Sequence, residues 1–410
     1  MGAVMTQAPH ILVINVFFAP NSYGGATIVA EQVAQSLRRT QGCRVTAISL
    51  CEGVNLVPYA VTKADKDGIV NYMINMPGGR GYATVYDNPE ITDQVGRLID
   101  RIGPDIVHVH CVQDIGAGIL QAIKLRGLPV VLSVHDFWWI CERQFMIKIN
   151  ERYCGQNPVR IENCRGCVDN FSAARTRFDY LRAQADHVDV ITYPSQFAKD
   201  LSEASGFGPG KGVVWGNGVM QPDAAFFAAQ ATRRAADPRV TFGFVGGPSQ
   251  IKGWPLIKRA FTGLGRDDFA VLPVDGSLDG TWWKGQKFDK LSGEWDVHPR
   301  FSQAQMDDYY AKIDVLLFMS QWKETFGLAI REALARGIHV IQTDSGGTTE
   351  HGAAEARDLI PIGADHTQLR EQILRALEAP TRGRAPWSVD SFDDQAAQFA
   401  QITAPLLHRS

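Results

Sequence analysis

The 410-residue sequence predicts an α/β protein with two parallel-sheet domains that face a central cleft. Short apolar runs of strand length alternate with segments of helical periodicity, and this alternation begins again after residue 217. Strands that alternate with helices and are buried on both faces indicate parallel sheets. The chain is too long to form a single domain around one ordinary hydrophobic core. Because open parallel sheets bind ligands at the carboxyl ends of their strands, we expect the site in the cleft.

The first half supplies the N-terminal domain, which we place at residues 1–216. Strands are predicted at 11–18, 44–50, 105–111, 129–134 and 189–194. After the first strand, a turn-rich segment leads into a helix at 27–39 whose apolar residues recur at helical spacing. A loop-rich insertion with four cysteines spans 141–167.

The second half repeats this order, and we place the C-terminal domain at residues 217–385. Strands are predicted at 240–247, 269–274, 314–320 and 338–343, and helices at 253–264, 303–313 and 327–337. Gly337 is suited to end the last of these helices. Turn-forming residues at 213–223 join the halves. The final segment, 386–410, is predicted to form a helix that packs back on the N-terminal domain.

Charge and hydropathy limit the classes of partner. The net charge of −3 does not suggest strong nucleic-acid binding. Residues 143–182 carry eight basic and four acidic side chains. We read them as a solvated face, with contact to an anionic substrate or membrane surface as the alternative. No apolar run is long enough to span a bilayer, and the N-terminus lacks signal-peptide features. We therefore expect a cytoplasmic protein, with peripheral contact at the inner face of the membrane as the alternative.

The stretch from Ser320 to Glu350 carries the main candidate site. Glu324 and Glu332 stand eight positions apart, and the small residues of 345–348 follow. A rise of 1.5 Å per residue separates the two carboxylates by at most roughly 12 Å, about the reach from a sugar ring to the ribose of an activated nucleotide. Carboxylates accept hydrogen bonds from paired hydroxyls. The N–H groups of Thr325, Phe326 and Gly327 lie at a predicted helix N-terminus that suits an anion. The alternative is an amphipathic helix with ordinary surface glutamates.

Residues 324–350, ETFGLAIREALARGIHVIQTDSGGTTE, resemble the signature of the family-four (group 1) retaining glycosyltransferases. That family has two Rossmann-like domains, the GT-B fold, and the order of elements is similar over nearly the whole chain. The resemblance implies that Glu324 contacts the donor sugar and that Glu332 binds ribose hydroxyls. It also implies that the loop 21–27, with Gly24 and Gly25, approaches the donor phosphate and the acceptor.

The same resemblance assigns two further residues. His135, at the end of a predicted strand, would face the donor sugar, and Lys252 would neutralise the diphosphate. The alternatives are a buried histidine whose hydrogen-bonding groups have partners within the protein, and a solvated lysine. The family commonly has an arginine five residues before this lysine, where the chain has Gly247. Lys323 and Arg331 are the candidates to supply the missing positive charge.

Two further segments are distinctive. Cys141, Cys154, Cys164 and Cys167 could supply four thiolates to a structural zinc ion. The alternatives are free structural thiols and disulfide or redox chemistry. Trp282, Trp283 and Trp295 lie between two predicted strands. We expect them to cover a hairpin, with stacking on sugars as the alternative.

The functional prediction is a retaining glycosyltransferase that uses a nucleotide-sugar donor, UDP- or GDP-linked, and requires no cofactor for its chemistry. The expected acceptor is a glycan or a lipid-linked sugar, in polysaccharide or glycoconjugate biosynthesis. The alternatives of the same fold are a nucleotide-sugar epimerase or a glycan phosphorylase. A sugar-nucleotide-binding protein without activity is a third reading, for which Gly247 is the only support.

Overall fold

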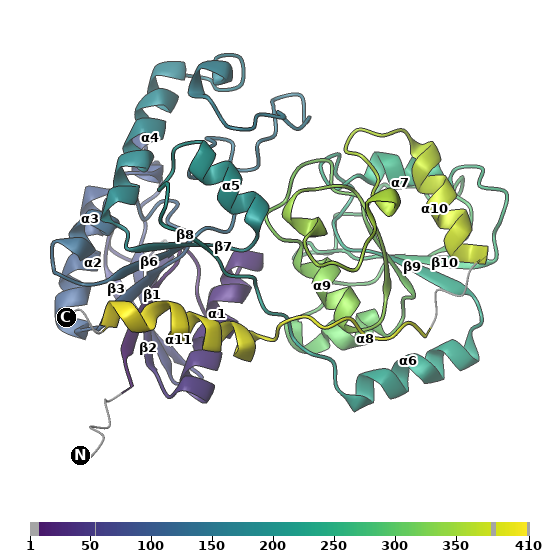
Figure 1. Cartoon of the computed structure of the whole chain (residues 1–410), viewed down its shortest axis with the longest axis horizontal. Coiled ribbons are helices and arrows are strands. Elements are labelled where there is room, and N and C mark those ends of the chain that lie inside the picture. Colours follow the sequence, from purple (N-terminus) through teal and green to yellow (C-terminus); the bar gives the residue numbers. More distant parts are fainter. Residues whose placement is uncertain (1–7, 54, 379–382, 408–410) are drawn as a thin grey trace. The chain divides into compact units, whose positions relative to one another are not determined.

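The computed structural model describes residues 8–53, 55–378 and 383–407, which group into two compact units. The first unit comprises the chain up to Gln144, Gly155–Gly218 and the segment from Asp390 onward (Figure 1). The second comprises Phe145–Cys154 and Val219–Val389. The chain thus passes between the units at 218–219. Residues 145–154, which the sequence places inside the N-terminal insertion, group with the second unit. The ends of the predicted segments, 1–7 and 408–410, lie outside the described residues.

An eight-stranded sheet forms the centre of the first unit, in the order β3-β4-β2-β1-β5-β6-β7-β8. Its strands are β1 (His10–Ile14), β2 (Arg44–Cys51), β3 (Val61–Lys66), β4 (Ile69–Asn75), β5 (Ile106–Val109), β6 (Val130–Ser133), β7 (Val190–Tyr193) and β8 (Gly212–Val214). Adjacent strands run parallel except for the edge strand β3, which is antiparallel to β4. The carboxyl ends of β5 and β6 are therefore neighbours.

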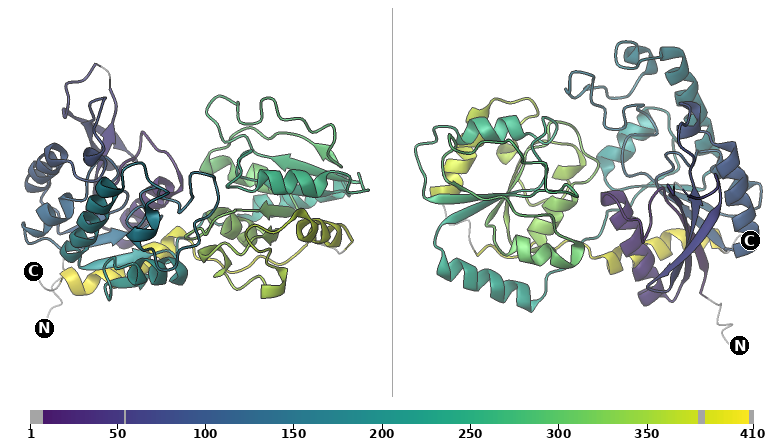
Figure 2. Two further views of the ribbon diagram at one scale, coloured as in Figure 1. Left: turned by 90° about the horizontal axis from the view of Figure 1, so that it is seen from above. Right: turned by 180° about the vertical axis from the view of Figure 1, so that it is seen from behind.

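Six helices accompany this sheet among the described residues (Figure 2). They are α1 (Gly25–Gln41), α2 (Pro89–Ile102), α3 (Ile119–Lys124), α4 (Phe171–Gln184), α5 (Gln196–Ala204) and α11 (Phe392–Leu407). The last helix, α11, contacts α1, so the end of the described chain belongs to the first unit. The Gln395 side chain in α11 accepts a hydrogen bond from the Gly218 N–H at 2.8 Å, which ties this helix to the residues where the first unit ends.

The second unit has a five-stranded parallel sheet in the order β11-β10-β9-β12-β13. Its strands are β9 (Val240–Phe244), β10 (Phe269–Pro273), β11 (Glu294–Trp295), β12 (Val315–Phe318) and β13 (His339–Gln342). Its helices are α6 (Ala224–Ala236), α7 (Trp254–Phe261), α8 (Met306–Tyr310), α9 (Leu328–Ala335) and α10 (His366–Glu378). One buried apolar cluster joins the sheet to α7 and α10, and another joins it to α6, α8 and α9. The sheet is therefore covered on both faces, which explains the continuous apolar runs of its strands.

These observations confirm an α/β fold with parallel sheets in two domains. The sequence predicts no strand at β3, because this edge strand reads VTKADK and is mostly exposed, so it lacks an apolar run. The predicted hairpin around the tryptophans is wrong: β11 is parallel to β10, and both strands belong to one sheet. Within residues 8–53, 55–378 and 383–407, no helix has the length and apolar character needed to cross a membrane.

Candidate active site

The loop between β12 and α9 brings Glu324 against the small-residue segment that follows β13. The Glu324 N–H donates to the Ser345 carbonyl at 2.9 Å, and the Gly347 N–H donates to the Glu324 carbonyl at 3.0 Å. These two bonds form an isolated parallel bridge between Glu324 and Gly346. Gly346 has φ of +72°, a conformation that side-chain-bearing residues rarely adopt. The glycine pair therefore lets the two loops at the carboxyl ends of β12 and β13 lie side by side.

The carboxylate of Glu324 has two polar partners. Its Oε1 accepts from Nζ of Lys252 at 2.8 Å and from the hydroxyl of Ser320. The Glu324 side chain is 13% exposed, so most of the ion pair is shielded from water. Nζ of Lys252 also lies 5.6 Å from the ring centroid of Trp322. The structure thus brings together two of the residues predicted as catalytic and adds Ser320, which the sequence analysis did not single out.

Lys252 is positioned by the turn that follows β9. Its N–H donates to Oγ of Ser249 at 3.3 Å. The next residue, Gly253, has φ of +80°, and a Cβ there would lie only 2.1 Å from the Met319 carbonyl oxygen. Only glycine allows this close approach between the β9 and β12 loops. Because β9 and β12 are paired, their carboxyl ends are adjacent, which explains how residues so far apart in sequence form one ion pair.

Glu332 lies on α9, and its carboxylate is partly buried. The Tyr310 hydroxyl donates to its Oε2 at 2.9 Å. Burial raises the pKa of Glu332 above its ordinary value, although the Tyr310 hydrogen bond and the nearby Arg336 charge act in the opposite direction. The α8 helix supplies Tyr310, and the sequence offered no motif that linked it to Glu332. This carboxylate is therefore not an ordinary solvated surface group.

Arg331 has a structural environment that the sequence analysis did not anticipate. Its side chain is 3% exposed. Its guanidinium donates to the carbonyls of Phe326, Gly347 (2.9 Å) and Thr348 (3.0 Å). It therefore ties the start of α9 to the small-residue segment. Arg331 is accordingly not available as the second cation of a diphosphate clamp.

The other candidate cation, Lys323, is also engaged. Its Nζ donates to the Asp344 carbonyl at 2.7 Å and pairs with the Asp344 carboxylate at 3.1 Å. Thr325 and Phe326 are buried, and Gly327 precedes α9 with φ of +82° and no side-chain cap. The predicted anion site at this helix start therefore rests on main-chain N–H groups.

In the first unit, the predicted glycine loop leads into α1. Gly24 caps this helix with φ of +82°, Gly25 is its first residue, and both are exposed. A Cβ at Gly24 would meet no atom within 4 Å. The glycine at this position is therefore required by the backbone conformation and leaves open space above the loop.

His135 follows β6 and lies beside a histidine that the sequence analysis did not single out. Its Nε2 lies 2.8 Å from Nδ1 of His110, which follows the neighbouring strand β5, and the two rings stack. His108, two residues earlier, has Nε2 2.7 Å from the Ser133 hydroxyl. Burial lowers the pKa of His135 to about 4 and that of His108 to about 3, and it holds that of His110 well below its ordinary value. All three rings are therefore neutral at physiological pH. The alternating pattern His108-Val109-His110 at a strand end was the signal in the sequence that could have identified this histidine cluster.

The four cysteines of the insertion do not form a metal site here. None of them forms a disulfide. Within the part of the chain that the structure describes, no group of three or more His, Cys, Asp or Glu side chains could hold a metal ion. The Sγ of Cys164 instead interacts with the Gln156 amide at 3.5 Å and the Arg160 carbonyl at 3.9 Å. The arrangement does not support the zinc prediction.

Comparisons with known proteins agree with the fold and with the motif. The Glycosyltransferase Family 4 model matches residues 23–220, and the Glycosyl transferases group 1 model matches residues 235–388. A curated Klebsiella pneumoniae protein, described as an uncharacterized 42.6 kDa protein in the cps region, is 23% identical over 83% of this chain and 87% of its own length.

Two solved structures illustrate the fold. Sucrose-phosphate synthase from Thermosynechococcus elongatus has a TM-score of 0.70 at 16% identity, with 98% of this chain and 100% of that chain covered. Anabaena Alr3699/HepE, solved in complex with UDP and glucose, has a TM-score of 0.64 at 15% identity, with 97% and 99% covered. Both are similar across their whole length.

The two-domain α/β fold, together with an ion-paired glutamate in the signature stretch, defines a glycosyltransferase with the GT-B architecture. The chain belongs to the family-four, group 1 glycosyltransferases, and it is an enzyme of hexosyltransferase type.

Proposed function

We propose that this enzyme is a retaining glycosyltransferase that moves a sugar from a nucleotide-diphospho-sugar to a hydroxyl acceptor. The observation that carries the proposal is the ion pair between Lys252 and Glu324. It stands at the carboxyl ends of β9 and β12, where parallel sheets bind ligands. Its glutamate lies within the stretch that resembles the family signature.

The chemistry follows from where charge develops. The bond between the anomeric carbon and the diphosphate oxygen breaks, and the acceptor hydroxyl forms its new bond on the same face of the sugar. The acceptor proton passes to the departing phosphate oxygen, so no protein base is needed. Lys252 stabilises the negative charge that develops on the diphosphate. Glu324 orients the donor sugar by accepting hydrogen bonds from its hydroxyls.

The remaining predicted residues bind and position the donor. Glu332 accepts hydrogen bonds from the ribose hydroxyls, and the N–H groups of Thr325, Phe326 and Gly327 contact the diphosphate. In the first unit, His135 faces the donor sugar as a neutral ring, because burial lowers its pKa to about 4. Gly24 leaves open space above the start of α1, and this loop, which also contains Gly25, would take the donor phosphate and the acceptor.

The donor is a UDP- or GDP-linked sugar, and the acceptor is a glycan or a lipid-linked sugar in polysaccharide or glycoconjugate biosynthesis. The similarity to a HepE structure that holds UDP and glucose supports a nucleotide-sugar donor. The relative from a cps region of Klebsiella pneumoniae supports a role in polysaccharide assembly.

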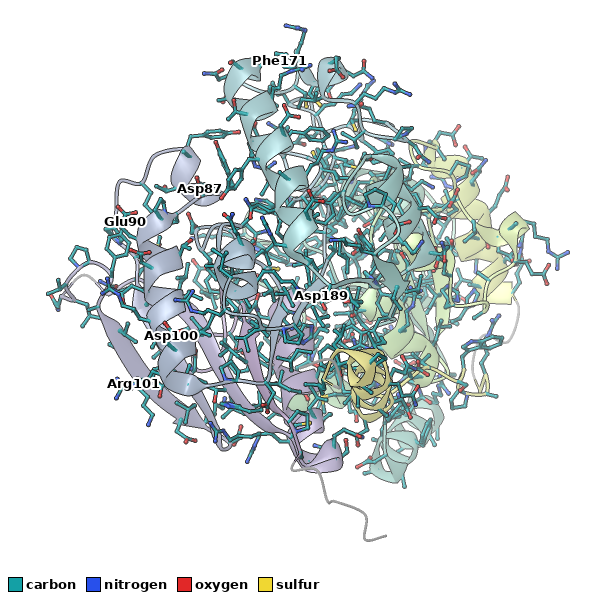
Figure 3. All side chains as sticks on the ribbon, turned by 60° about the vertical axis from the view of Figure 1, so that its left-hand side comes forward. Asp87, Glu90, Asp100, Arg101, Phe171 and Asp189 are labelled. Atoms are coloured by element: carbon teal, nitrogen blue, oxygen red, sulfur yellow. The ribbon has the colours of Figure 1, made fainter. Side chains whose placement is uncertain are left out.

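A cytoplasmic location with peripheral contact at the inner face of the membrane completes the proposal. Seven of the eight basic residues of 143–182 are exposed, and Arg177 is the buried exception. Phe171 marks the start of α4 (Figure 3), with the guanidinium groups of Arg165 and Arg175 at 4.1 and 5.7 Å from its ring centroid. Sedimentation with anionic and with neutral vesicles tests this contact, and equal binding to both would contradict it.

The first experiment is a thermal-shift panel with UDP, GDP, ADP and their sugar conjugates. A ligand that binds only the folded state raises the melting temperature. We expect a shift with UDP or GDP compounds that is lost in Glu332→Ala and kept in Glu371→Ala, which changes an exposed glutamate on α10. The absence of any shift, or a shift retained in Glu332→Ala, would contradict the proposed donor site.

A product assay separates transfer from the alternatives. The compound that gives the shift is incubated with sugar acceptors, and the glycosylated product and released nucleotide are measured together. Transfer yields one nucleotide for each sugar moved, with the anomeric configuration kept. An interconverted nucleotide-sugar without nucleotide release would indicate an epimerase, and binding without turnover would indicate an inactive protein.

A further inference from the structure

The Trp282 indole occupies the place that a side chain at position 247 would take. Gly247 has φ of +66°, and a Cβ built there would lie 2.6 Å from Cε3 of Trp282. A Cβ built at Gly276 would lie 2.6 Å from Cζ3 of the same ring. Heavy atoms do not approach this closely, so both positions must be glycine for the ring to lie where it does. The two glycines form a flat seat for one indole.

This seat lies at the carboxyl edge of the second sheet, where open parallel sheets bind ligands. Gly247 follows β9 and Gly276 follows β10, and these strands are parallel neighbours. A Cβ added at Gly246 would lie 3.1 Å from Cβ of Lys252, so the indole borders the turn that carries the proposed diphosphate lysine. The carboxyl ends of β10, β9 and β12 thus present Trp282, Lys252 and Glu324 in that order along the sheet.

The loop that carries Trp282 is held in place by its neighbours. Nε1 of Trp283 donates to the Val274 carbonyl at 2.9 Å, and Trp283 is 5% exposed within the apolar cluster. The Thr281 N–H donates to Oγ of Ser277 at 2.8 Å. Trp282 itself is 44% exposed, which is a large apolar surface to leave in water. Adjacent tryptophans therefore differ in role, since one anchors the loop and the other presents its ring.

We propose that Trp282 is a stacking platform for the flat apolar face of a ring in the nucleotide-sugar donor. This inference rests on the proposed function. It accounts for the departure from the family pattern, because an arginine at position 247 would collide with the indole. The chain has therefore exchanged a cationic side chain beside the diphosphate for an aromatic contact with a ring of the same ligand. Both the base and the sugar have a face that can stack on an indole.

Calorimetric titration with UDP, UDP-glucose, GDP and GDP-mannose tests this role. We expect Trp282→Ala to weaken binding of the preferred compound about tenfold or more, and Trp282→Phe to retain most of the affinity. Trp387→Ala is the matched control, because Trp387 is 46% exposed in the same unit, and its affinity is expected to equal that of the wild type. A loss of affinity for both the nucleoside diphosphate and its sugar conjugate would assign the base, and a loss confined to the sugar conjugate would assign the sugar.

A second variant tests the seat itself. Gly247→Ala places a Cβ against the indole and should weaken binding in the wild-type background. In the Trp282→Ala background the same change should weaken binding less, because the indole that it displaces is gone and only the backbone strain at φ of +66° remains. Equal affinities of Trp282→Ala and Trp387→Ala would overturn the platform while leaving the proposed function intact. A wild-type protein that binds none of the four compounds would overturn both.

Discussion

Nζ of Lys252 lies 2.8 Å from Oε1 of Glu324, although 72 residues separate them in sequence. The contact exists because Lys252 follows β9, Glu324 follows β12, and these strands are neighbours in one parallel sheet. Its consequence is that the positive charge proposed for the diphosphate already has a partner. Donor binding must therefore share or replace this ion pair, and the two residues should act as a unit.

The first prediction concerns the pair of Lys252 and Glu324. Lys252→Met should lower kcat/KM by about 10²- to 10³-fold, because charge on the leaving group loses its stabilisation. Glu324→Ala should mainly lower kcat. The double variant should lose much less than the product of the two single losses, because each removes the partner of the other. Initial rates of sugar transfer give kcat/KM for the wild type, the two single variants and the double variant. Independent, multiplicative losses would contradict the coupling.

The second prediction uses the partly buried carboxylate of Glu332. Its pKa is raised, so the folded state favours the neutral form more than the unfolded chain does, and stability is lost as pH rises through the folded pKa. Glu332→Gln is neutral at every pH. It should therefore melt higher than the wild type without ligand at pH 7 to 8, and this difference should shrink as pH falls toward 4.5.

The same variant should bind the nucleotide about tenfold more weakly, because charge-assisted hydrogen bonds to the ribose are lost. Higher stability with weaker binding would separate the binding role from a structural one. Glu371→Gln on α10 is the control, and we expect it to change neither quantity. A pH-independent difference in melting temperature would argue against a raised pKa at Glu332.

The third prediction concerns Arg331, which holds three carbonyls at the start of α9 and in the following loop. Lysine keeps the charge but cannot reproduce the planar geometry of several N–H donors. Arg331→Lys should lower the free energy of unfolding by about 2–4 kcal/mol. It should also raise KM for the donor more than it lowers kcat, because Glu324 pairs with the loop that Arg331 holds. Urea unfolding and steady-state rates measure both, and an unchanged KM would restrict Arg331 to stability.

The sequence predicted β9, β10, β12 and β13 of the second sheet, because strands buried on both faces read as continuous apolar runs, but it did not predict the two-residue edge strand β11. The roles of Glu324, Glu332 and Lys252 came from a family resemblance, and the contact between Lys252 and Glu324 required the sheet order that only the structure provides. Trp282 was ambiguous for another reason. Its role depends on Gly247 and Gly276. The sequence shows both glycines, but it does not show which ring lies against them.

Arg331 and His110 show a second limit. In the sequence, an arginine whose guanidinium contacts main-chain carbonyls cannot be told from a surface arginine, because its partners are groups that every residue carries. His110 and His135 are 25 residues apart, and their contact follows from the pairing of β5 with β6. The spacing of two strand ends in sequence does not reveal which strands are neighbours.

The last prediction follows from the neutral histidines of the first unit. The pKa of His135 is lowered to about 4 and that of His108 to about 3, mainly because both rings are buried. Between these values and the ordinary 6.5, the unfolded chain binds more protons than the folded one. Stability should therefore be fully present above pH 6.5 and should fall as pH drops toward 4, by on the order of 3 kcal/mol for His135 alone. Urea unfolding at pH 7, 6 and 5 measures this slope. His108→Gln should flatten it, whereas His366→Gln on α10 should leave it unchanged, and equal slopes in the wild type and His108→Gln would show that His108 is not held neutral by the fold.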